Sequence, residues 1–187
     1  MKRSNDDPAV RSIVLQDDGI YPNNPRPLLL YARAVPADPG DIERLFTAND
    51  WPSAWRNGVY PYHHYHSTAH EALGVYSGSA EIQFGGPDGT AVTIHAGDVA
   101  VIPAGVAHKN LGASSNFRVV GAYPRGQRPD MNRGRAGERP RADREIARVA
   151  LPAAAALVLQ GLGGFMLLAL NIVLARLLGA DGYGAYA

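Results

Sequence analysis

The chain contains no cysteine among its 187 residues, so neither disulfides nor thiolate chemistry can contribute to its fold or function. It also lacks net charge, since the formal value is only +1 at pH 7. No acidic or basic block interrupts residues 12–123, and nucleic acid is therefore not expected as a partner. Residues 1–10 have two basic side chains but no apolar run behind them, which excludes a secretory signal there and predicts a cytoplasmic location for the domain that follows.

One stretch has a spacing that indicates metal chemistry. Gly58 is followed after five residues by His64, then after one by His66, after four by Glu71 and after six by Gly78. Side chains alternate along a strand, so His64 and His66 are expected to share a face and to converge on one ion. Glu71 lies at an odd offset from His66, so the residues between them are expected to turn the chain and bring Glu71 back on a neighbouring strand.

A second stretch has a matching pattern. Gly97 is followed after five residues by Pro103, then after one by Gly105 and after two by His108. Together the two patterns resemble the two sequence motifs of the cupin superfamily, over residues 21–124. The flanking text resembles a small bacterial subfamily of single-domain cupins, YjlB-like and uncharacterised.

The resemblance implies a metal site. It would hold one divalent transition metal, Mn, Fe, Ni, Co or Zn, through His64, His66, Glu71 and His108. Three neutral imidazoles and one carboxylate would leave a net charge near +1, which favours anionic or chelating oxygen ligands. In an octahedron two positions would remain open for a substrate.

Other polar residues near the motifs can either face the ion or have a purely structural role. By strand parity His63 and His70 should face away from the ion. Tyr60 and Tyr62 share the parity of the ligands, although aromatic packing at the barrel end explains Tyr60 better and Tyr62 equally well. The second motif has Gly112 where the superfamily usually has Asn, and Asn110 shares the parity of His108. Tyr62 and Asn110 are accordingly the predicted catalytic residues.

The pattern of apolar residues predicts an all-β fold, an antiparallel jelly-roll barrel with one short N-terminal helix after Asp38 and an apolar C-terminal helix. Two early strands are expected at Ser12–Gln16 and Leu28–Val35. Seven more follow at short intervals with glycine between them: Val59–His66, His70–Tyr76, Ala80–Phe84, Thr90–Ile94, Val99–Ile102, Val106–Leu111 and Phe117–Tyr123. The predicted domains are a disordered tail (1–11), the cupin barrel (12–124), an Arg-rich extended segment (125–149) and an apolar helix (150–187).

The last segment is predicted to be a transmembrane helix. Residues 150–175 contain no charged side chain and are long enough to cross a bilayer, and arginines precede them. These features predict that the chain is anchored through residues 157–178 to the cytoplasmic face of the inner membrane; a buried helix is the alternative. Residues 156–187 also resemble the first helix of polysaccharide flippases, but transport is not inferred, because one span cannot line a path.

Three functions remain open from the sequence. The first is a small metal-dependent enzyme of the dioxygenase, isomerase or decarboxylase type that acts on an oxygen-chelating small molecule. The second is a metal-containing sensor or binding module without turnover. The third, a purely structural metal, is disfavoured because structural ions usually have closed ligand shells. The sequence leaves a homodimer open.

Overall fold

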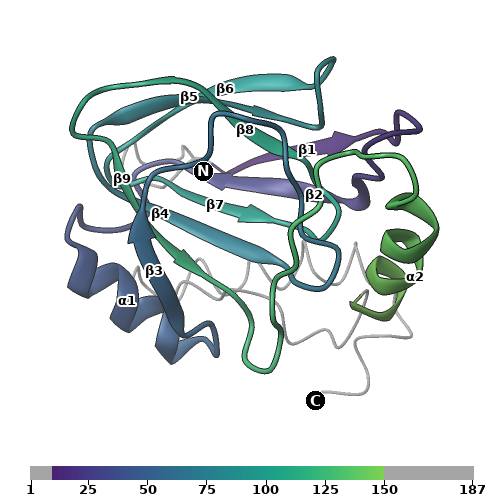
Figure 1. Ribbon diagram of the computed structural model, residues 1–187. Coiled ribbons are helices and arrows are strands. Elements are labelled where there is room, and N and C mark those ends of the chain that lie inside the picture. Colours follow the sequence, from purple (N-terminus) through teal and green to yellow (C-terminus); the bar gives the residue numbers. More distant parts are fainter. Residues whose placement is uncertain (1–9, 150–187) are drawn as a thin grey trace, which may run out of the picture.

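The computed structural model describes residues 10–149, which form a mostly β structure (Figure 1). Within this range the elements are β1 (Val10–Leu15), β2 (Asn24–Tyr31), α1 (Pro39–Ala48), β3 (Ser53–Asn57), β4 (Glu71–Ser77), β5 (Ser79–Phe84), β6 (Thr90–His95), β7 (Val99–Ile102), β8 (His108–Ala113), β9 (Arg118–Ala122) and α2 (Arg139–Val149).

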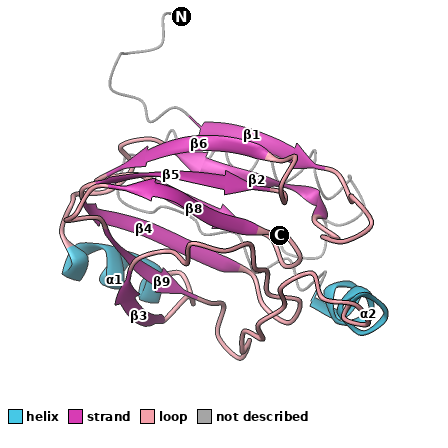
Figure 2. Ribbon diagram, turned by 45° about the horizontal axis from the view of Figure 1, so that its top comes forward, coloured by secondary structure: helices cyan, strands magenta, loops and turns pink. Residues whose placement is uncertain are grey.

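The strands form two antiparallel sheets, as the jelly-roll prediction requires (Figure 2). One sheet has the order β1-β2-β7-β4-β9-β3, and the other has the order β6-β5-β8. Phe84 at the end of β5 pairs with Thr90 at the start of β6, so Gly85–Gly89 closes a hairpin between these strands. The prediction of an antiparallel all-β jelly roll is confirmed.

Strand β4 shows how the sequence divides its side chains between two cores. Leu73 and Val75 belong to the apolar cluster that also contains Ile82 and Phe84 of the second sheet. Ala72 belongs instead to the cluster formed with α1. Successive residues of a strand point to opposite faces, so β4 serves both clusters.

Helix α1 covers the outer face of the larger sheet (Figure 1). Asp38 caps it by accepting a hydrogen bond of 2.9 Å from the Asp41 N–H, as the sequence predicted. Ile42 and Phe46 are fully buried against the sheet. A Cβ on Gly74 would lie 2.5 Å from Ile42 Cγ2, so only glycine lets the helix approach this closely.

Two sequence predictions of local structure are wrong. No strand spans Val59–His66; an unpredicted strand, β3, lies just before it, and residues 59–66 form irregular chain with two isolated bridges. The proline and the bends at Pro61 and Tyr62 explain the loss of continuous pairing.

The Arg-rich segment 125–149 is not extended throughout, because its second half forms α2. Arg139 makes two hydrogen bonds, of 2.8 and 2.6 Å, to the carboxylate of Asp17. Ala142 is fully buried, and the side chain of Ile146 packs over Gly105. The helix is therefore held by contacts with distant residues that its own composition does not reveal.

The predicted tail at residues 1–11 falls mostly outside the described residues, and the predicted apolar helix at 150–187 falls wholly outside them. Within residues 10–149, no helix has the length and apolar character needed to cross a membrane.

Candidate metal centre

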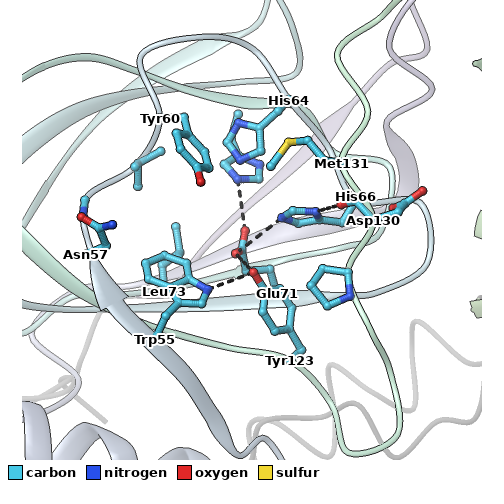
Figure 3. A pocket seen from close by; sticks show the side chains of 14 residues that line it. Trp55, Asn57, Tyr60, His64, His66, Glu71, Leu73, Tyr123, Asp130 and Met131 are labelled. Atoms are coloured by element: carbon cyan, nitrogen blue, oxygen red, sulfur yellow. Dashed lines mark hydrogen bonds and ion pairs between the residues drawn. The ribbon is translucent and has the colours of Figure 1, made fainter.

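The two sequence motifs meet at a cavity of about 390 Å³ (Figure 3). Its lining includes all four predicted ligands, His64, His66, Glu71 and His108. All four side chains are buried, with at most 7% of their surface exposed. Such a group of titratable side chains is costly to bury unless something binds it.

The first motif reaches the second through backbone pairing. His64 and His108 exchange both backbone hydrogen bonds, of 3.2 and 2.9 Å, as an isolated antiparallel bridge. Tyr65, between the two histidines, pairs on its other side with Asn132. The expected alternation thus holds over residues 64–66, although the long strand does not form. Glu71 begins β4, which pairs with β7 and β9 rather than with residues 59–66.

Each of the three histidines holds its ring in the same manner. His64 Nδ1 lies 3.2 Å from the Tyr62 carbonyl and His108 Nδ1 lies 3.3 Å from the Val106 carbonyl. His66 Nδ1 contacts the Asp130 carbonyl. A carbonyl oxygen can only accept, so each Nδ1 must carry a proton, and in the neutral imidazole this leaves the Nε2 lone pair free. This is the arrangement that metal-binding histidines usually show.

The free nitrogens converge on Glu71. His66 Nε2 lies 3.6 Å from Glu71 Oε1, and His108 Nε2 lies 3.1 Å from Glu71 Oε2. Ligand atoms of His64, His66 and His108 all lie within 4.8 Å of one another. Glu71 Oε2 is buried and has no hydrogen-bond partner. A buried, unpartnered carboxylate oxygen facing three imidazole lone pairs fits a divalent transition metal in both donor chemistry and position.

The pKa values of the clustered side chains give the charge of the site without a metal. Burial, together with the neighbouring His108 and His66, lowers the pKa of His64 to about 3, so His64 is neutral at pH 7. Burial alone would raise the pKa of the Glu71 carboxyl, but its contacts with His108 and His66 hold it below the usual range. Burial alone would lower the pKa of His66, which Glu71 raises instead. Glu71 is therefore ionised and carries the negative charge of the site.

Tyr123 and Trp55 extend the site beyond the motif residues. The Tyr123 hydroxyl donates to Glu71 Oε1 at 2.9 Å and accepts from Trp55 Nε1 at 3.0 Å (Figure 3). Burial and the Glu71 carboxylate raise the pKa of Tyr123, so its phenol stays protonated. This chain of hydrogen bonds fixes one carboxylate oxygen and leaves Oε2 directed at the histidines. The alternation of side chains along the predicted strands did not identify Tyr123 as a site residue.

A second group of unpredicted contacts comes from the 127–132 segment, which runs beside residues 65–70. The Asp130 carboxylate accepts from the Ser67 N–H and the Ser67 hydroxyl, both at 2.6 Å. Its carbonyl is the acceptor for His66. Gln127 accepts from the His70 N–H at 2.9 Å, and Arg141 of α2 donates to Asn132 at 2.9 Å. The 127–132 segment thus holds the loop that carries His66.

His63 and His70 stay out of the cluster, as expected. The His63 ring lies 5.6 Å from the Tyr21 ring. His70 Nδ1 accepts from the Ala104 N–H at 2.9 Å, so it is the opposite tautomer to the three clustered histidines. Neither histidine lines the cavity.

The predicted catalytic residues lie elsewhere. The Tyr62 ring stacks on Tyr60, with the Arg133 guanidinium 3.8 Å from its centroid. Asn110 Oδ1 accepts from the Gly112 N–H at 2.9 Å, a local turn contact. Neither residue lines the cavity, and the centroid of the Tyr62 ring lies 5.8 Å from that of the His64 ring. Their catalytic role stays a sequence prediction, and Tyr123 is the phenol that donates a hydrogen bond to Glu71.

Comparisons with known proteins agree with this fold. Residues 56–120 match the Cupin_2 family, described as a cupin domain. A protein of Bacillus subtilis (strain 168), described as uncharacterized protein YjlB, is 48% identical over 138 residues, which is 73% of this chain and 83% of that protein. The chain belongs to the cupin family. Because that relative is described as uncharacterized, the similarity assigns no activity to this cupin.

Solved structures similar to this cupin are more distant. A DUF861 family protein from Thermotoga maritima is 18% identical, with a TM-score of 0.33, over 46% of this chain and 93% of that one. A cupin 2 domain-containing protein from Halorhodospira halophila is 14% identical, with a TM-score of 0.32, over 79% of this chain and 85% of that one.

Proposed function

We propose that this cupin binds one divalent transition metal through His64, His66, Glu71 and His108, and that it is a small metal-dependent enzyme acting on an oxygen-chelating substrate. The observation that carries the proposal is the common tautomer of the three histidines: each gives its Nδ1–H to a backbone carbonyl and turns Nε2 toward the buried Glu71 carboxylate. Unliganded buried histidines would not need this shared orientation.

A bound divalent ion would supply Lewis acidity, polarising substrate oxygens held beside it. The chain itself supplies the rest. The three imidazoles and Glu71 together carry one negative charge, so an anionic chelating group would still find a net positive site. Tyr123, protonated and adjacent to Glu71, orients that carboxylate. The surrounding buried side chains restrict the access of water to the ligand atoms.

The second candidate is a sensor or binding module, and one feature of the site favours it. Glu71 is the only carboxylate of the cluster and is surrounded by the histidines, while the Asp130 carboxylate is already bonded to Ser67 and Asn132. Among the residues that line the cavity in the described part of the chain, no carboxylate remains free to act as a base.

One experiment separates the two functions. The metal-loaded protein is titrated by calorimetry with 2-oxo acids, diketones, enediols and catechols, and each ligand is then incubated with the protein with and without dioxygen. An enzyme transforms at least one bound chelator. If chelators bind and none is transformed, the sensor function replaces the enzyme. If no two-oxygen compound binds better than its one-oxygen analogue, the ligand class is wrong.

A further inference from the structure

The cavity lining also contains apolar side chains, besides the proposed ligands. Trp55, Val59, Leu73, Pro129 and Met131 contribute apolar side chains to its lining (Figure 3). Asn57 adds a carboxamide. In Figure 3, Trp55 and Leu73 lie on one side of Glu71, and Met131 lies beside His64. Adjacent to the histidines, the cavity thus offers a mainly apolar wall.

The charged residues that line this cavity are of one sign. Among its described lining residues none is Lys or Arg, while Glu71 and Asp130 are both carboxylates. Arg141 lies outside the lining, 3.8 Å from Asp130 Oδ2, and pairs with that carboxylate. A ligand carrying a second anionic group, away from the metal, would therefore meet no cation in the described lining of the cavity.

Two large apolar side chains at the cavity are exposed to solvent. Tyr60 is 49% exposed and Met131 is 44% exposed, and both line the cavity. The Tyr60 ring contacts His64 edge-on, with centroids 5.2 Å apart. Exposed apolar groups gathered at a concave site, rather than scattered singly, are a common mark of ligand contact.

We infer that the ligand has a chelating pair of oxygens at one end and a compact, uncharged apolar body, such as an aromatic ring, at the other. The inference rests on the proposed function, because the oxygen end needs the metal. The apolar body would lie against Trp55 and Leu73 and extend between Tyr60 and Met131. The cavity volume of about 390 Å³ is enough for one such ring with its chelating group.

Two hydroxamic acids with the same chelating head test the inference directly. Acetohydroxamate and benzohydroxamate differ only in a methyl group against a phenyl ring. Calorimetry with the metal-loaded, full-length protein should show benzohydroxamate binding about 10- to 100-fold more tightly, because the ring leaves water for an apolar wall. Addition of a para carboxylate to that ring should weaken binding again by at least about tenfold. Equal affinities for the first two compounds, or undiminished binding of the third, overturn the inference.

A matched pair of variants locates the apolar body. Met131→Ala should lower the benzohydroxamate affinity about threefold to tenfold and leave the acetohydroxamate affinity and the metal content unchanged. Leu111→Ala is the control, since Leu111 is 42% exposed but does not line the cavity. An equal effect of both variants would contradict the placement.

Metal content is measured in the same samples, which separates the two possible failures. Absence of bound metal overturns the proposed function and this inference together. Bound metal with tight acetohydroxamate binding but no preference for the ring overturns this inference alone.

Discussion

The Tyr123 hydroxyl donates a hydrogen bond of 2.9 Å to Glu71 Oε1, across two adjacent strands of the larger sheet. The register of β4 and β9 pairs Ala72 with Ala122, so the next pair along brings Glu71 and Tyr123 together. Because the phenol occupies one carboxylate oxygen, the other stays directed at the histidines. Tyr123 therefore positions a proposed metal ligand without being one.

Replacement of Tyr123 by Phe should lower metal affinity about 10- to 100-fold, the usual effect of removing a group that orients a metal ligand. Competition with a chromophoric chelator measures the affinity. Tyr60→Phe is the control, because Tyr60 lines the same cavity and has no hydrogen bond to Glu71. An unchanged affinity in Tyr123→Phe would show that Glu71 does not depend on this contact.

Asp130→Asn should weaken the hold of the 127–132 segment on the ligand loop. The loss of one acceptor oxygen leaves a group on Ser67 or Asn132 poorly paired, so the free energy of unfolding should fall by about 1–3 kcal/mol. Metal affinity should fall with it, because the backbone of Asp130 also orients His66. Chemical denaturation and metal competition measure both effects. Asp88→Asn, at an exposed position, should change neither.

Acid should destabilise the metal-free protein through His70. Burial lowers the pKa of His70 to about 4, below the value of about 6.5 expected for an unfolded chain. Between these values the unfolded state binds more protons than the folded state, so stability rises with pH and is lost on acidification. This contribution is at most about 1.4 kcal/mol per pH unit.

Denaturation of wild type and His70→Gln between pH 4 and 7 isolates this contribution, because glutamine keeps a neutral acceptor for the Ala104 N–H. Wild type should lose stability relative to the variant as the pH falls. His95→Gln, at an exposed position, should retain the wild-type profile. Parallel profiles of wild type and His70→Gln would mean that His70 is not held neutral by the fold.

The sequence was most informative where local pattern and motif coincide. The spacing of His64, His66 and Glu71 identified the clustered side chains, and alternating apolar residues located β4 to β9 within a few residues. The strand predicted over residues 59–66 does not form, because only two isolated bridges, to His108 and Asn132, pair this segment. The alternation of apolar residues does not reveal how far such pairing extends.

The remaining parts of the site depend on contacts between distant residues. Asp130 lies more than sixty positions from Ser67, and no spacing rule connects them. Tyr123 was placed at the end of a predicted strand, but its proximity to Glu71 follows only from the pairing of β4 with β9. Helix α2 escaped prediction because its Arg-rich sequence has a single buried residue, Ala142. Contacts between residues distant in the sequence were the missing information in each case.

The central claim is that His64, His66, Glu71 and His108 hold one divalent transition metal. Elemental analysis of protein purified without added metal, compared with the double variant His64→Ala/His66→Ala and with His63→Ala, tests it most directly. We expect about one ion per chain in wild type and in His63→Ala, and none in the double variant, which should also lose the stabilisation that metal binding gives the folded state. Full metal occupancy in the double variant, or an equal loss in His63→Ala, would contradict the site.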